Sequence, residues 1–125
     1  MKKLFMILTA AAFLCITTAC GTTDVTTGVT TVEASTEIDI MEVGGLCGMC
    51  KTNIEQAAQG VDGVIKAEWD RESKILTLEF DPAKTQLGAI SKAIANVGYD
   101  TEMDKADDEV YVALPDCCKY RDDIT

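Results

Sequence analysis

The sequence contains no histidine, and its 11 lysine and arginine residues face 21 aspartate and glutamate residues, for a formal charge of −10. Histidine is the commonest metal ligand and the usual general base at neutral pH, so metal sites and catalytic sites built on imidazole are excluded. The shortage of basic residues argues against a nucleic-acid partner, because phosphate binding needs clustered Lys and Arg. A chain of 125 residues has room for one domain with extensions.

The N-terminal residues resemble an export signal. Lys2 and Lys3 precede an apolar run over residues 4–16, and the small residues 17–19 follow it. That order is typical of a secretory signal peptide, which we assign to residues 1–19. The apolar run is shorter than the roughly 20 residues that a bilayer-spanning helix needs, so cleavage is favoured over an uncleaved membrane span.

Cys20 directly follows the small residues, and this arrangement resembles the lipobox of bacterial lipoproteins, in which the cysteine is acylated and becomes the mature N-terminus. Thr17 departs from the Leu usual in a lipobox, and an ordinary signal peptide with Cys20 as a bystander is the alternative. Residues 20–36 are rich in Thr and lack helical periodicity, which predicts a tether. We therefore expect an exported lipoprotein at the periplasmic face of the membrane or at the cell surface.

Hydrophobic periodicity changes from residue 37 onward. Apolar residues alternate over 37–40, 65–69 and 76–80, as in β-strands, and repeat at helical spacing over 54–61 and 87–97. A short last strand over 99–103 completes the order βαββαβ. That order predicts an α+β, ferredoxin-like sandwich with two helices on one face of a four-stranded antiparallel sheet. The Ile, Leu, Val and Ala residues of these segments are expected to form the core.

Cys47 and Cys50 form a C-x-x-C motif in the stretch GGLCGMC, before the first predicted helix. A helix N-terminus stabilises thiolate, the form that binds metal. A closed zinc site needs about four ligands, and two thiolates without imidazole favour thiophilic ions, Cu(I) first, with Hg(II), Ag(I), Zn(II) and Cd(II) as other candidates. The alternative is a thiol:disulfide oxidoreductase with Cys47 as nucleophile, although the predicted strand order differs from that of thioredoxin.

The segment GGLCGMCKTNIEQAA, the following VDGV, the strand pair and the late Gly-Tyr-Asp at 98–100 together resemble the heavy-metal-associated domain of copper chaperones, P-type metal-ATPase tails and mercury-binding periplasmic proteins. The resemblance covers residues 37–104. It implies that Cys47 and Cys50 are the metal ligands and that Tyr99 lies close to them. It also implies a binding protein rather than an enzyme, with a metal-transporting ATPase, an efflux component or another metal-binding protein as partner.

The loop departs from the family at two positions. The family usually has a Met two residues before its first Cys, packed inward to brace the loop, and this chain has Gly45 there. A methionine, Met49, lies instead between the two cysteines. We expect Met49 to be an exposed, variable residue rather than a thioether ligand.

Residues 105–125 form an acidic C-terminal extension beyond what the family fold needs. It contains an apolar stretch over 110–114 and the adjacent pair Cys117 and Cys118. If the apolar stretch packs on the domain, the pair could join the first loop in a three- or four-thiolate site. If it does not, the two cysteines form a disulfide elsewhere or remain free thiols, and the sequence leaves both outcomes open.

The favoured function is therefore soft-metal binding for trafficking, scavenging or resistance outside the cytoplasm. A sensor or accessory subunit that binds metal only to modulate a partner is a further possibility.

Overall fold

The computed structural model describes residues 35–124. The predicted signal peptide, Cys20 and nearly all of the predicted tether lie outside the described residues. The domain elements follow the order strand, helix, strand, strand, helix, and a C-terminal segment of short helical turns comes after them. Their bounds are β1 Glu37–Glu42, α1 Gly48–Gln59, β2 Val64–Trp69, β3 Ile75–Phe80, α2 Leu87–Ala95, α3 Asp108–Val112, η1 Asp116–Cys118 and η2 Tyr120–Ile124.

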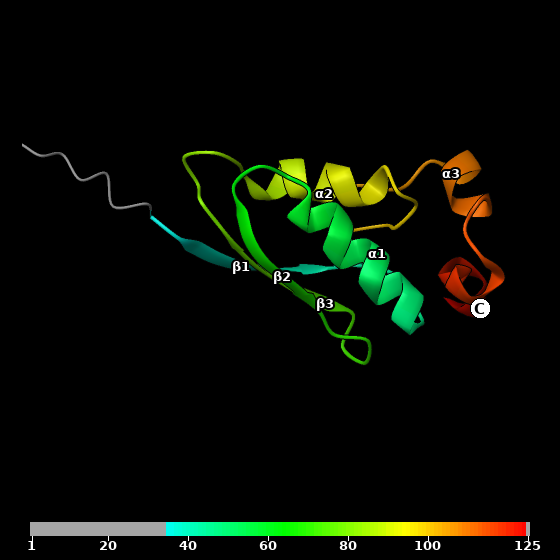
Figure 1. The fold of residues 1–125 in the computed structure, drawn as a ribbon. Helices are drawn as coiled ribbons and strands as arrows, with labels where there is room; N and C mark the ends of the chain where they lie inside the picture. The colour runs from blue at the N-terminus through cyan, green and yellow to red at the C-terminus, as the bar shows by residue number, and fades with distance from the viewer. Residues whose placement is uncertain (1–34, 125) are drawn as a thin grey trace, which may run out of the picture. The chain divides into compact units, whose positions relative to one another are not determined.

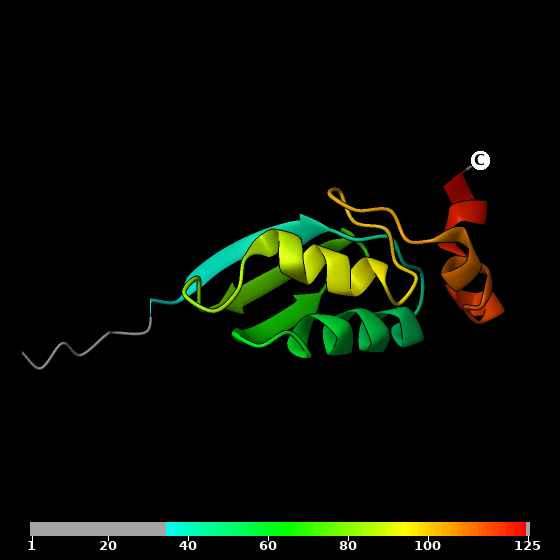
Figure 2. The same cartoon turned by 90° about the horizontal axis from the view of Figure 1, so that it is seen from above.

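The sheet is antiparallel, with strand order β1-β3-β2. Helices α1 and α2 lie side by side on one face of it (Figures 1 and 2), which confirms the predicted α+β class. The β2–β3 hairpin turns at residues 70–74, where the carboxylate of Asp70 accepts hydrogen bonds from the N–H groups of Glu72 and Ser73. This side chain satisfies the turn's backbone donors and so fixes the hairpin.

The predicted fourth strand, residues 99–103, does not form as a full strand. Residues 99–103 contribute a single antiparallel bridge, between Val43 and Thr101. The hydroxyl oxygen of Thr101 then accepts hydrogen bonds from the N–H groups of Met103 and Asp104, at 3.1 and 2.8 Å. Because a side chain takes these two donors, the backbone turns away from β1 after one pair. The sheet of residues 35–124 therefore has three strands plus this bridge.

The core forms on the face of the sheet that the two helices cover. In β1, the residues that point into this core are not the ones predicted but those that alternate with them. Ile38 and Ile40 are 71% and 57% exposed, whereas Met41 is buried. The register pairs Ile40 with Thr77 and Met41 with Leu76, and paired residues share a face of the sheet. The buried Leu76 therefore fixes which side chains of β1 point inward. Two further positions that the sequence assigns to the core are also exposed, Ile65 and Val97.

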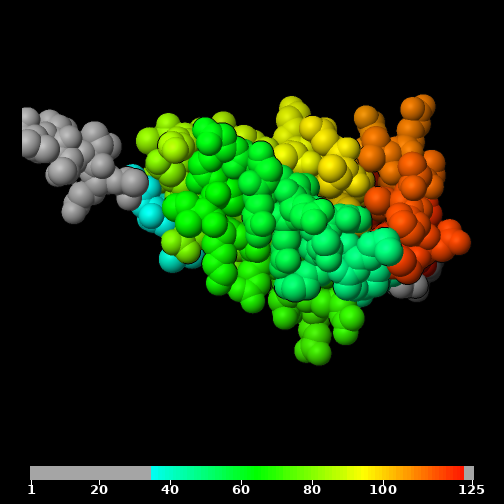
Figure 3. Space-filling model, in the orientation of Figure 1, coloured from blue at the N-terminus to red at the C-terminus, as the bar shows by residue number. Residues whose placement is uncertain are grey.

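The C-terminal segment, residues 105–124, packs against the end of the domain where α1 begins (Figure 3). Tyr111, Cys118 and Tyr120 belong to the same buried cluster as the residues of the sheet and helices. Leu114 packs on Gly98, whose φ of +102° is the left-handed conformation that glycine adopts most readily. Within the described residues, no helix combines the length and the apolar character that crossing a bilayer requires.

Candidate metal centre

The C-x-x-C motif lies where the loop after β1 becomes helix α1. Cys47 is the N-cap residue, with extended backbone angles, and Cys50 lies in the first turn of the helix. Their Sγ atoms are 3.4 Å apart. The Cys50 Sγ also accepts a hydrogen bond of 3.4 Å from the N–H of Leu46. The motif therefore places both sulfur atoms at a helix N-terminus, among backbone donors that favour thiolate.

Trp69 braces this loop from below. Its indole is fully buried, and its Nε1–H donates to the carbonyl of Val43 at 3.1 Å. A Cβ at Gly45 would lie 2.9 Å from two indole carbons and 3.2 Å from the Cβ of Cys50. Trp69 thus occupies the space next to Gly45, so the loop is supported although the Met usual in the family is absent.

Tyr120 anchors the C-terminal segment beside the loop. Its hydroxyl donates to the carbonyl of Gly98 at 2.9 Å and accepts from the N–H of Asp100 at 2.7 Å. Its ring stacks on Tyr99, with centroids 6.0 Å apart. The same ring lies against Gly44, where a Cβ would come within 2.6 Å of it. The segment therefore contacts the loop at a position that only glycine fits without displacement.

Arg121 adds a second anchor next to Tyr120. Its guanidinium donates to both carboxylate oxygens of Asp100, at 2.8 and 2.6 Å, and to Asp108 at 2.7 Å. It also lies 4.2 Å from the ring centroid of Tyr111. The bidentate pair is the strong geometry for Arg and carboxylate. Burial alone would raise the pKa of Asp100, but the hydrogen bonds from Arg121 and from the Ala106 N–H hold it below its usual value.

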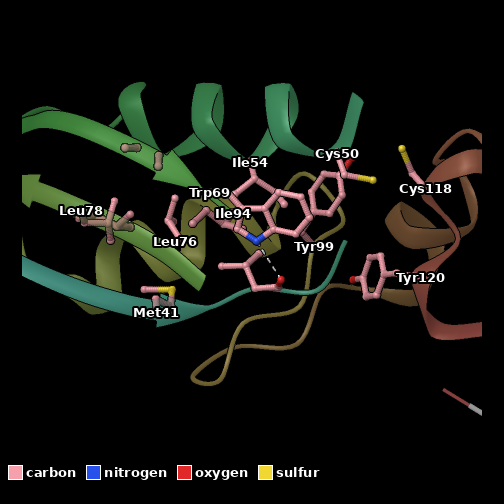
Figure 4. Close-up of a cluster of buried hydrophobic side chains, with 14 of the residues drawn as sticks. Met41, Cys50, Ile54, Trp69, Leu76, Leu78, Ile94, Tyr99, Cys118 and Tyr120 are labelled. Atoms are coloured by element: carbon pink, nitrogen blue, oxygen red, sulfur yellow. Dashed lines mark hydrogen bonds between the residues drawn. The ribbon is translucent and has the colours of Figure 1, made fainter. Parts of the chain in front are cut away.

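These anchors bring the two tail cysteines to the C-x-x-C motif. The Sγ atoms of Cys47, Cys50 and Cys118 all lie within 4.8 Å of one another. In Figure 4 the sulfur atoms of Cys50 on α1 and Cys118 on the C-terminal segment point toward each other. The Sγ of Cys117 is 3.7 Å from that of Cys47 and 3.9 Å from that of Cys118. None of the four cysteines in the described residues forms a disulfide, so the structure brings together the four residues that the sequence left as two separate pairs.

The thiols of this cluster differ in burial and ionisation. Burial alone would raise the pKa of Cys47, but the backbone N–H of Cys50 and the thiols of Cys50, Cys117 and Cys118 outweigh it and lower that pKa to about 7. Burial, together with the thiol of Cys50, raises the pKa of Cys118 to about 12. Cys47 therefore ionises more readily than Cys118, which keeps its proton at neutral pH.

The residues predicted to lie near the site are placed as follows. Tyr99 is fully buried beside the thiols, its hydroxyl accepting from Asn53 at 3.0 Å, and burial raises its pKa well above the usual range. Gly45 is buried against the indole of Trp69, and Met49 is 50% exposed.

Tyr120 and Arg121, which fasten the segment, are the residues that sequence reasoning missed. The available signal was an aromatic residue and an arginine, two and three positions after a cysteine pair, in a predominantly acidic extension.

Comparisons with known proteins agree on one family. Residues 40–100 match the heavy-metal-associated domain. The copper chaperone CopZ of Staphylococcus aureus is 35% identical over 63 residues, which cover 50% of this chain and 93% of that protein. Among solved structures, a CopZ metallochaperone is 32% identical, with a TM-score of 0.51, and the match covers 52% of this chain and 98% of that one.

Oxidised MerP from Ralstonia metallidurans is 30% identical, with a TM-score of 0.52, and the match covers 54% of this chain and 96% of that one. A copper binding domain from the P-type ATPase HMA7 is 27% identical, with a TM-score of 0.50, over 52% of this chain and 89% of that one. The names of three of these relatives, two chaperones and a copper binding domain, are in line with the prediction of a binding protein. On the matched domain and on the near-complete coverage of its relatives, this chain belongs to the heavy-metal-associated domain family.

Proposed function

We propose that this protein binds one soft metal ion, Cu(I) before others, through the thiolates of Cys47, Cys50 and Cys118. The observation that carries the proposal is the group of three sulfur atoms within 4.8 Å of one another at a helix N-terminus. The chain has no histidine to complete a mixed site, and thiolate ligands select Cu(I) and other thiophilic ions. Similarity to copper chaperones supports the same ion.

The sulfur separations favour three-coordination over two. With a metal–sulfur bond of about 2.3 Å, a linear pair separates its sulfur atoms by about 4.6 Å and a planar trigonal set by about 4.0 Å. Cys47 and Cys50 lie 3.4 Å apart, and Cys47 and Cys118 lie 3.7 Å apart. The trigonal arrangement therefore needs the smaller displacement. A tetrahedral zinc site would require Cys117 as well; its Sγ lies 3.7 Å from that of Cys47 and 3.9 Å from that of Cys118, but outside the group of three that includes Cys50.

Metal would enter and leave by ligand exchange with a partner's thiols. Each incoming thiolate bonds to the ion as a resident thiolate leaves it and takes up a proton, so the ion is not released to water and its oxidation state does not change. A metal-transporting ATPase, an efflux component or another metal-binding protein is the proposed partner. Similarity to a copper binding domain of a P-type ATPase supports this class.

We place this activity outside the cytoplasm, in trafficking, scavenging or resistance. The N-terminal signal pattern supports export, and the lipobox-like arrangement at Cys20 supports a lipid anchor at the periplasmic face of the membrane or at the cell surface. The Thr-rich residues 20–36 would separate the domain from the membrane surface, and residues 37–104 and 105–125 would act together as the binding unit.

An anaerobic competition titration tests the proposal. The full chain carrying Cys15→Ser and Cys20→Ser keeps only the four clustered thiols, and bicinchoninate competes for Cu(I), with Zn(II) and Hg(II) titrated in parallel. We expect one Cu(I) per chain, and Cys118→Ser should weaken binding by about ten- to a hundredfold, because a tethered ligand acts at high effective concentration. Met49→Leu is the matched control and should bind as the parent does. Cu(I) binding that neither Cys47→Ser nor Cys118→Ser weakens would contradict the proposal.

A further inference from the structure

The two adjacent tail cysteines lie in different environments. Both belong to the 3-10 turn η1, in which successive side chains point about 120° apart. Cys118 is fully buried and belongs to the group of three thiols. Cys117 is exposed and lies outside that group, although its Sγ is 3.7 Å from that of Cys47. One cysteine of the pair therefore faces into the site and the other faces solvent.

Cys47 connects the inner and outer thiols. Its Sγ lies 3.4 Å from that of Cys50, 3.7 Å from that of Cys118 and 3.7 Å from that of Cys117. It is half-buried, whereas Cys50 and Cys118 are fully buried. A metal ion held by Cys47 and Cys117 at the surface would thus need to give up a single ligand, Cys117, to reach the inner group.

We infer that Cys117 is the exchange ligand of this site: it receives the soft metal ion from a partner's thiol, passes it inward while Cys47 stays bound, and reverses the step on release. The inference rests on the proposed function. In the inward step, the bond between the ion and the Cys117 sulfur breaks, and bonds to the Cys50 and Cys118 sulfurs form, which completes the three-thiolate set. Each arriving group that is still a thiol gives its proton to water, the departing Cys117 thiolate takes one up, and no electron is transferred.

The packing of the C-terminal segment is the reason that such a ligand is needed. The ring of Tyr120 lies on Gly44 of the loop, and Arg121 binds Asp100 through two hydrogen bonds. A partner could reach the buried thiols directly only after these contacts break. Cys117 gives access to the ion while the segment stays in place, so exchange need not wait for the segment to open.

Stopped-flow transfer of Cu(I) to bicinchoninate tests this role, in the full chain carrying Cys15→Ser and Cys20→Ser. Cys117→Ser should slow transfer by about tenfold or more, because the tethered surface thiol acts at an effective concentration on the order of millimolar. Its equilibrium affinity should stay within about twofold of the parent, as for a surface substitution. Cys117→Met should recover part of the rate, since a thioether also binds Cu(I).

Two results would overturn the inference. Transfer from Cys117→Ser at the parent's rate would mean that Cys117 takes no part in exchange. An affinity loss as large as that of Cys118→Ser would make Cys117 a resident ligand instead. A parent chain that holds no Cu(I) against the chelator would refute the proposed function as well, and the equilibrium titration separates that outcome from the other two.

Discussion

Replacing Arg121 with alanine should release the C-terminal segment while leaving the sheet folded. The change removes two hydrogen bonds to Asp100, one to Asp108 and one to the carbonyl of Ala106. An exposed ion pair contributes up to about 1 kcal/mol, and breaking a fully buried one costs about 3–5 kcal/mol. The side chains of Arg121 and Asp100 are 18% and 27% exposed, which places this pair between those limits, at about 2 kcal/mol. The population of opened segment should then rise about 30-fold.

Amide hydrogen exchange of the metal-free protein measures that population directly. The N–H groups of Tyr111, Leu114 and Cys118 bond to carbonyls within short turns of the segment. Turns of this length do not persist without packing, so these amides become free to exchange when the segment opens. Their exchange should accelerate about 30-fold, while amides of β3 keep the parent's rates. Arg71→Ala, in the exposed β2–β3 turn, removes the same charge elsewhere and is the control. Acceleration of the segment by less than about threefold would refute the reasoning, because the segment would then not depend on this contact.

Two further predictions concern the same contact region. Gly44→Ala should destabilise the protein by about 1–3 kcal/mol, since its Cβ would lie 2.6 Å from the ring of Tyr120. Gly48→Ala is the control and should not destabilise it, because the space around Gly48 is open. Thermal unfolding measures the stability of both variants. The folded-state pKa of Asp100 lies below its unfolded value, so the ionised carboxylate contributes its full stabilisation well above about pH 4 and loses it as the pH falls below that value. The free energy of unfolding in urea should therefore depend less on acid pH in Asp100→Asn than in the parent. An equal dependence in the two proteins would refute this.

Local patterns in the sequence predict the parts of this structure that depend on neighbouring residues. Leu76, Leu78 and Phe80 alternate with polar residues and are buried as expected. Cys47 and Cys50 lie at the start of a helix because the glycine-rich loop precedes a helical apolar pattern. The order of strands and helices followed from the same periodicity, and the resemblance to a metal-binding family agreed with it.

Features that depend on distant residues could not be predicted in this way. The alternation of Ile38 and Ile40 suits a buried strand, yet the pairing of Met41 with Leu76 determines which face is covered. The last strand is short because the side chain of Thr101 turns the chain, which hydrophobic periodicity does not record.

The largest gap in the sequence prediction is the position of the C-terminal segment, which left the role of Cys117 and Cys118 open. A hydroxyl of Tyr120 bound to residues 98 and 100, and a glycine that accommodates its ring, create this packing. The contact between Tyr120 and Gly44 cannot be predicted from the sequence, because a tyrosine and a glycine more than 70 positions apart share no periodic pattern.

The separation of the thiols along the chain has a consequence for biosynthesis. Cys118 lies 71 residues after Cys47, so a chain that emerges N-terminus first presents its C-x-x-C motif well before its third thiol. During that interval the two leading cysteines are exposed to oxidants and to stray metal without the inner ligand. On the proposed three-thiolate site, a chain stopped between residues 104 and 117 would have only Cys47 and Cys50 to bind the ion, and would therefore bind it more weakly. The three-thiolate binding that we propose would thus require a chain whose synthesis has passed residue 121, because Arg121 binds Asp100 and holds the segment in place.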